Sequence, residues 1–227
     1  MSYIGNKPAN KAVVASDLDP AVITGQTALA TSPADTDEFL ISDAGVLKRL
    51  DASLIGGGAH VLLATTNVTS GVSQVDFTSG IDSTYKNYMI SFTDVHPATD
   101  SVQLQMRISI SSTFKTDTSY IYGGIGRESD AGVISFSDST GSGFKLNHNL
   151  GNASNESSSG NVILHNPSGT TFSKMFQADA TSVSAGSRGN KTIVGGFYNS
   201  TSAVDGVRFY MSSGNIDLGT FKLYGIN

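Results

Sequence analysis

The segment Val102-Gln103-Leu104-Gln105-Met106-Arg107-Ile108-Ser109-Ile110 decides the fold class of this 227-residue chain. Its apolar residues alternate strictly with polar ones, which is the period of a β-strand that buries one face. Tyr88, Ile90 and Phe92 show the same alternation shortly before it. Residues 94–100, which include His96-Pro97, are predicted to form the turn between these two strands.

Short strands punctuated by turns are predicted for the rest of the second part of the chain. Ser142-Gly143 and Ser213-Gly214 are examples of the turn signals that separate them. Further strands are expected at 60–65, 72–77, 120–125, 132–137, 144–148, 161–165, 171–177, 192–198, 205–211 and 216–226. Helices do not alternate with these strands. The pattern predicts an all-β protein, with a jelly-roll-like antiparallel β-sandwich.

A boundary between two regions is predicted at Gly56-Gly57-Gly58, where three glycines give the backbone unusual freedom. Residues 1–58 contain only Tyr3 and Phe39 of the 19 Tyr and Phe residues. Since aromatic side chains dominate core burial, residues 1–58 are not expected to build a globular core by themselves. We expect an N-terminal arm at 1–58, which docks on a partner or trimerises, and a sandwich at 59–227.

One hairpin is predicted within the arm. Residues 39–42 and 46–50 read as short strands on either side of the turn signal at residues 43–45. Pro8, Pro20 and Pro33 favour extended chain before it. A two-stranded hairpin is marginal in water, so neighbouring copies are expected to cover it. The alternative is an arm that folds back onto its own domain.

The composition argues against several classes of function. Lys and Arg number 14 against 19 Asp and Glu, a net charge of −5, and only 15% of residues are charged. A chain of this charge is not expected to bind nucleic acid. It is also not expected to bind a membrane surface through a cluster of basic residues. No apolar run is long enough to insert in a membrane. The chain contains no Cys, which excludes disulfides, thiol catalysis and Cys-ligated metals.

No catalytic, metal-binding or cofactor-binding motif stands out. The four histidines show no metal-ligand spacing, and the densest acidic cluster, Asp35, Asp37 and Glu38, lacks the calcium-loop pattern. No Ser lies in a G-x-S-x-G turn. We therefore expect a protein without catalytic residues, metal or cofactor.

The polar stretch 149–160 is predicted to be a long exposed loop, where binding commonly occurs. An exposed tyrosine near such a loop can stack on a sugar ring. The candidate glycan-binding residues are Asn147, Asn149, Asn152, Asn155, Tyr120 and Tyr122. The alternatives are an inert loop and tyrosines that are half-buried on strands.

Several motifs resemble virion proteins of tailed bacteriophages, in particular tail fibres of marine and cyanobacterial phages. The similar segments are Tyr3-Ile-Gly-Asn-Lys-Pro8, Ile23-Thr-Gly-Gln-Thr-Ala-Leu29, residues 32–51, residues 85–110 and Gly219-Thr-Phe-Lys-Leu-Tyr-Gly-Ile226. The resemblance covers most of the chain. It does not choose among a tail fibre, a head fibre and a capsid decoration or cement protein.

The resemblance implies a homotrimer that is anchored to other virion proteins through its N-terminal segment, assembled in the bacterial cytoplasm, and directed with its distal domain toward a host surface glycan. The residues expected to anchor it to the particle are Tyr3, Ile4, Pro8, Ile23, Phe39, Leu40, Ile41 and Leu47. The leading expectation is a non-enzymatic short tail fibre; the alternatives are a decoration protein and a polysaccharide depolymerase.

Overall fold

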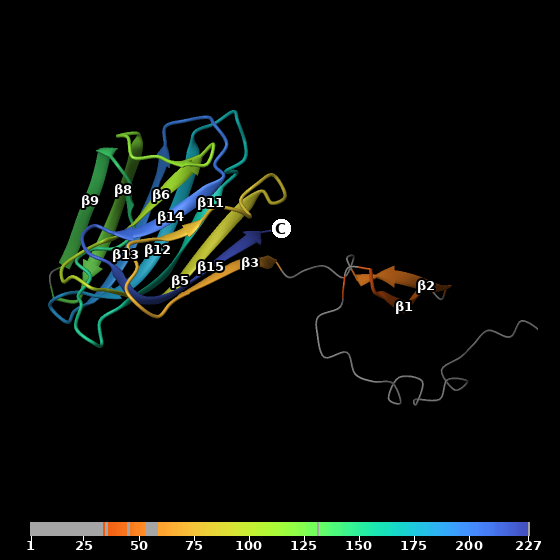
Figure 1. Ribbon diagram of the computed structural model, residues 1–227, viewed down its shortest axis with the longest axis horizontal. Coiled ribbons are helices and arrows are strands. Elements are labelled where there is room, and N and C mark those ends of the chain that lie inside the picture. The colour runs from red at the N-terminus through yellow and green to blue at the C-terminus, as the bar shows by residue number, and fades with distance from the viewer. Residues whose placement is uncertain (1–33, 35, 45, 53–58, 131, 227) are drawn as a thin grey trace, which may run out of the picture. The chain divides into compact units, whose positions relative to one another are not determined.

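The computed structural model describes residues 34, 36–44, 46–52, 59–130 and 132–226 (Figure 1). The described chain is built from antiparallel β-strands, which confirms the all-β prediction. It divides into two compact units, Met1–Gly56 and Gly57–Asn227, so that the division falls within the predicted glycine run.

The first unit contains the predicted hairpin. Strands β1 (Glu38–Asp43) and β2 (Val46–Asp51) pair antiparallel, from Glu38 opposite Asp51 to Asp43 opposite Val46. Ala44 lies in the turn with a positive φ of 50°, a left-handed conformation typical of tight turns. The predicted extended arm falls on residues 1–33, which lie outside the described residues.

The second unit is a sandwich of two antiparallel sheets. The larger sheet has the strand order β3-β15-β5-β11-β12-β13-β8-β9. Its strands are β3 (His60–Val68), β15 (Ile216–Ile226), β5 (Asn87–Pro97), β11 (Ser158–His165), β12 (Lys174–Val183), β13 (Gly189–Tyr198), β8 (Tyr120–Glu128) and β9 (Gly132–Gly141). The smaller sheet has the order β10-β6-β14-β4, and β7 pairs with β6. Its strands are β10 (Phe144–Lys145), β6 (Leu104–Ile110), β14 (Gly206–Met211), β4 (Val75–Phe77) and β7 (Thr113–Phe114).

The hydrophobic core lies between the two sheets, because each sheet turns one side of its alternating strands toward the other. Phe209 of β14 packs on Phe221 of β15, with ring centroids 5.2 Å apart, and Phe144 of β10 lies against Phe176 of β12 at 3.6 Å. The antiparallel sandwich is thereby confirmed, whereas the jelly-roll-like connection of its strands stays a prediction.

Two predicted boundaries are wrong for one physical reason. Residues 94–97 were expected in a turn but continue β5, and Ser158–Gly160 were expected in a loop but begin β11. Both segments contain residues typical of turns and loops, yet their backbones pair with neighbouring strands, and Val95 and Ser158 lie opposite each other with 0% exposure. Such a composition does not report the hydrogen bonding of the backbone, so it hides strand ends of this kind.

Candidate functional site

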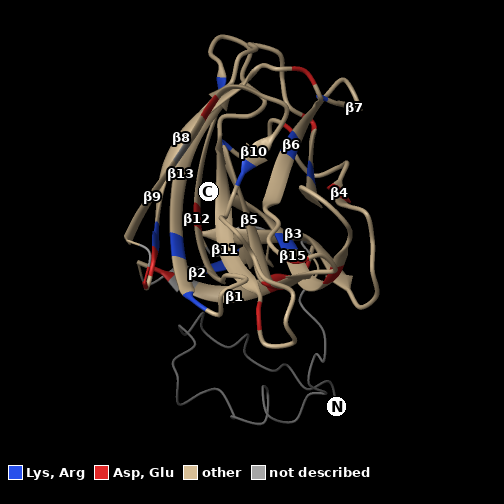
Figure 2. Ribbon diagram, turned by 90° about the vertical axis from the view of Figure 1, so that its left-hand side faces the viewer, with Lys and Arg blue, Asp and Glu red and all other residues tan. Residues whose placement is uncertain are grey.

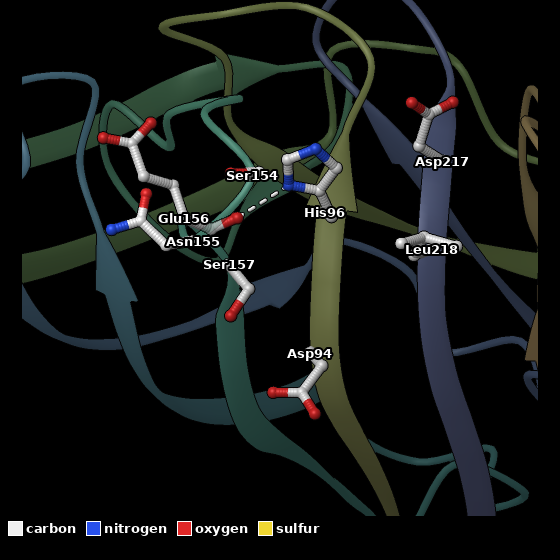
Figure 3. Close-up of a pocket in the computed structure, with 8 residues that line it drawn as sticks. All are labelled: Asp94, His96, Ser154, Asn155, Glu156, Ser157, Asp217 and Leu218. Atoms are coloured by element: carbon white, nitrogen blue, oxygen red, sulfur yellow. Dashed lines mark hydrogen bonds between the residues drawn. The ribbon is translucent and has the colours of Figure 1, made fainter.

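A polar cleft of about 440 Å³ lies on the sandwich where β5, β15 and the segment before β11 meet (Figure 3). The cleft is lined by Asp94, His96, Ser154, Asn155, Glu156, Ser157, Asp217 and Leu218. These residues come from three parts of the chain that lie far apart in sequence. We take this cleft as the candidate binding site.

A bulge in β5 positions Asp94 at the cleft. Tyr88, Ile90 and Phe92 point into the core, so strict alternation would turn Asp94 inward as well. Instead Thr93 and Asp94 are both exposed, and burial resumes at Val95. Asp94 has a positive φ of 52°, and the pairing of β5 with β11 shifts register around it, since Phe92 lies opposite Gly160 and Val95 opposite Ser158. The extra residue thus keeps a carboxylate out of the core and presents it at the surface.

Strand β15 is also irregular beside this bulge. Its pairing with β5 shifts register on both sides of Leu218. Gly219 has a φ of +142°, and a Cβ there would come within 3.0 Å of the Val95 backbone. Glycine is needed at this position for both reasons. The irregular pairing leaves the Leu218 side chain 50% exposed beside Asp217.

His96 connects β5 to the opposite wall of the cleft. Its Nδ1 lies 2.7 Å from the backbone carbonyl oxygen of Glu156. Because a carbonyl oxygen only accepts, Nδ1 carries the proton and donates this bond. In the neutral imidazole, Nε2 is then left as a hydrogen-bond acceptor. The amide of Asp94 donates to Ser159 Oγ at 3.0 Å, which ties the bulge to β11 as well.

The segment between Leu150 and β11 is held by a buried carboxylate. Glu156 is only 3% exposed; its Oε2 accepts from the amide of Ala153 at 2.9 Å, and its Oε1 accepts from Ser187 Oγ at 3.2 Å. Gly151 lies directly next to this carboxylate. A Cβ at Gly151 would collide with the Glu156 carboxylate. Leu150 pairs with Val102 and Ser184. The wall of the cleft is therefore anchored at several points.

The chemistry of the cleft suits a neutral polyhydroxylated ligand. Asp94 and Asp217 offer carboxylate acceptors, and Asn155 and Ser157 offer groups that both donate and accept. Leu218 supplies an exposed apolar surface of the kind that the C–H face of a sugar ring covers. The lining residues contain acidic side chains and neither Lys nor Arg. This charge disfavours an anionic ligand.

The structure separates the residues predicted to bind glycan. Asn155 lines the cleft and Asn152 is exposed nearby, where its amide side chain donates to the Ala98 carbonyl at 3.2 Å. Asn149 is half-buried with a positive φ of 50°. Asn147 is 2% exposed, and its Oδ1 accepts from the Leu104 amide at 2.8 Å.

The prediction that Tyr120 and Tyr122 stack on a sugar is wrong, as is the prediction that the Asn147 side chain binds one. Tyr120 and Tyr122 are 0% and 4% exposed because both point from β8 into the core. The Tyr120 hydroxyl donates to the Lys115 carbonyl at 2.8 Å. Burial raises the pKa of Tyr122 to about 12.

Of the predicted anchoring residues, Tyr3, Ile4, Pro8 and Ile23 lie outside the described residues. The hairpin carries the others. Phe39 and Leu40 of β1 are 39% and 73% exposed, Ile41 is half-buried, and Leu47 of β2 pairs with Ser42.

Sequence reasoning missed Asp94, His96, Asp217 and Leu218 as a group. One signal was present: the alternation from Tyr88 to Phe92 would bury Asp94 if it continued, and a carboxylate in that position indicates a bulge. The approach of β15 to β5 has no such signal in the sequence.

No family model matches the chain, and searches of curated proteins and of solved structures give no match either. Within the described residues, no three His, Asp or Glu side chains are grouped as metal ligands. The same residues include no helix of the length and apolarity needed to span a bilayer.

Proposed function

We propose that this chain is a structural protein of a bacteriophage virion, a short homotrimeric tail fibre. Residues 1–58 attach it to other virion proteins and hold the copies together. The sandwich of residues 59–227 contacts a neutral glycan on the host surface through the polar cleft. The protein acts by binding and not by catalysis.

One observation carries the proposal: the chain joins a sandwich that has its own core to a separate unit whose hairpin exposes apolar side chains. A hairpin of this kind is only marginally stable by itself, and Leu40 is 73% exposed. Attachment to a particle would cover the exposed apolar side chains of this hairpin. The motifs that resemble phage fibres point in the same direction.

Several weak cleft contacts suffice for host attachment, because copies on one particle bind together. Linking binding sites multiplies weak affinities through effective concentration. A cleft lined mostly by polar residues therefore fits a multivalent binder better than a tight monovalent one.

A glycan array tests the binding role with the full chain. Asp217→Asn is expected to lower binding of a neutral glycan about tenfold, the usual effect of losing one charged hydrogen bond. Leu218→Ser is expected to lower it by a similar factor of about ten, because it removes apolar contact with the sugar ring. Asp130→Asn, at an exposed position outside the cleft, is the matched control. Equal binding by all variants would exclude the cleft as the glycan site.

Gold-labelled antibody against residues 59–227 tests the place in the virion. Label at the tail supports a tail fibre. Label spread over the head contradicts it and favours a capsid decoration protein, for which the copy number is far higher.

A further inference from the structure

The outward face of the larger sheet carries a concentration of apolar side chains over β12, β13, β8 and β9. We call this set the outer apolar patch; it consists of Ile121, Ile125, Val133, Phe172, Met175, Ile193 and Phe197. Five of these side chains are at least half exposed, with fractions of 58% for Ile125, 65% for Val133, 69% for Phe172, 54% for Met175 and 54% for Ile193.

Strand register brings these side chains together. Ile125 pairs with Ile193, and Phe197 pairs with both Ile121 and Met175. Gly123 and Gly195 pair between these two groups, and a Cβ at Gly123 would meet nothing within 4 Å. The patch thus consists of two groups of apolar side chains, and between them the backbone of Gly123 and Gly195 lies without side chains.

Two hollows are recessed into the patch. One of about 330 Å³ is lined by Ile125, Gly126, Arg127, Val133, Lys191 and Ile193. The other, of about 310 Å³, is lined by Phe172, Ser173, Met175 and Phe197. In Figure 2, most of the ribbon of β8, β9 and β13 is free of charged residues. The relief suits contact with another apolar surface, while Arg127, Lys191 and Asp179 place charged side chains at the edge of the patch.

The fold itself does not require an apolar outer face. An antiparallel sheet packs one face on the core and normally turns polar side chains to water on the other. Further along the same face, Lys222, Ser91 and Asn161 follow one another across β15, β5 and β11 and are polar. The five half-exposed side chains of the patch expose on the order of 100 Å² each, so the patch reaches about 500 Å², within the range for the largest patch of a monomer.

The point where the chain enters the sandwich lies at the same end of the strands as part of the patch. Strand β3 begins at His60, and a single line of cross-strand partners leads from it to the patch. This line is His60, Ile226, Asn87, His165, Met175, Phe197 and Ile121. The patch therefore includes the end of the strands at which residues 1–58 join the sandwich.

We propose that the outer apolar patch is the contact between the sandwiches of neighbouring copies of this chain. This inference rests on the homotrimer of the proposed function. Copies that are joined through residues 1–58 have this end of their sandwiches brought close together, so that a modest apolar contact forms at high effective concentration. A standard stable interface buries about 800 Å² on each partner, so the patch supplies the apolar centre of such a contact and not all of its area.

The absence of cysteine from the chain allows a direct test with single cysteines. Ile193→Cys and Met175→Cys place a thiol in the patch of the full-length protein. Leu218→Cys is the matched control, because Leu218 is 50% exposed on the same sheet but lies at the polar cleft. Maleimide labelling rates are measured for each, relative to the rate in denaturant, and mass photometry gives the oligomeric state of the same samples.

We expect the patch thiols to react at least tenfold more slowly than the Leu218→Cys thiol in a sample that is trimeric. A trimer whose patch thiols react as fast as the control overturns the proposed contact and leaves the trimer standing. A monomer overturns the trimer and this contact together, whichever rate is found. As a second variant, Ile193→Asp is expected to raise the labelling of Met175→Cys to the control rate, and an unchanged slow rate contradicts the contact.

Discussion

The Nδ1 nitrogen of His96 lies 2.7 Å from the carbonyl oxygen of Glu156, a residue sixty positions later in the chain. This bond joins the bulged end of β5 to the segment before β11, which forms the other wall of the cleft. The shape of the cleft thus depends on a side chain of one wall that holds the backbone of the other. A histidine in this role positions one wall of the cleft through the backbone of the other.

His96→Leu is expected to lower the free energy of unfolding by about 1 kcal/mol, the net value of one hydrogen bond, and to loosen the segment before β11 more than the rest. Hydrogen exchange of the amides of residues 153–157 measures the local effect. His165→Leu, on the outer face of the same sheet, is the control. Exchange that rises equally throughout the sandwich, or not at all, contradicts the positioning role.

Gly151→Ala is expected to distort the cleft wall. Its Cβ would collide with the Glu156 carboxylate and lie 2.8 Å from the Ala185 Cα, so that buried charge and backbone must both move. A cost of about 2–4 kcal/mol is expected, in the range of overpacking and of a disturbed buried carboxylate. Thermal unfolding measures it. Gly189→Ala is the control, since a Cβ there meets nothing within 4 Å; equal losses in both variants would contradict the explanation.

Among the described residues, Arg208 and Asp76 form an ion pair that is joined by two hydrogen bonds. Nε and Nη2 of Arg208 each donate to a different Asp76 oxygen at 2.7 Å, and the guanidinium lies 4.0 Å from the centre of the Phe114 ring. The hydrogen bonds with Asp76 raise the pKa of Arg208. Both side chains are about a quarter exposed, so water screens the pair only in part.

A double-mutant cycle with Arg208→Met and Asp76→Asn is expected to give a coupling energy of about 1–2 kcal/mol. The matched cycle is Lys191→Met with Asp179→Asn, a pair whose side chains are 49% and 46% exposed. Exposed pairs contribute roughly 0.2–1 kcal/mol. Urea unfolding at two salt concentrations gives both values. A larger coupling energy for Lys191 and Asp179 would show that the two hydrogen bonds between Arg208 and Asp76 do not decide which ion pair is stronger.

The sequence predicts the elements of this fold better than their arrangement. The strict alternation through Leu104 and Ile110 marks β6, and residues 216–226 coincide with β15. Alternation works there because one face meets the core and the other meets water. By contrast, the strand predicted at 171–177 occurs as Lys174–Val183, and Phe172, which the prediction included in the strand, precedes it and is exposed.

The candidate site was predicted only in part, because it depends on strand pairing. Asn155 was found from the polarity of its segment, whereas Asp217 and Leu218 reach the cleft through irregular pairing of β15 with β5. The prediction that Tyr120 and Tyr122 contact a ligand was wrong because composition does not say which face of β8 points into the core. The inward face is the one whose tyrosine rings pack against Phe144 of the other sheet.

Buried tyrosines make alkaline stability a test of the core. Burial raises the pKa of Tyr122 to about 12, and burial together with the hydrogen bond to Asp117 raises that of Tyr198 to about 12. An unfolded chain releases these protons near pH 10. The folded state therefore holds protons that the unfolded state has lost between about pH 10 and about pH 12. By linkage, stability is fully present below about pH 10 and falls as the pH rises through this window.

Tyr122→Phe is expected to make that fall shallower, since it removes one of the buried ionising groups and leaves the ring packed against Phe144. Each such group contributes at most about 1.4 kcal/mol of lost stability for each pH unit in the window. Urea unfolding followed by circular dichroism at about pH 9 and about pH 11 measures the loss, with Tyr85→Phe at a partly exposed position as the control. If Tyr122→Phe loses as much stability between these pH values as the unmodified chain, ionisation of Tyr122 does not limit the alkaline stability of the core.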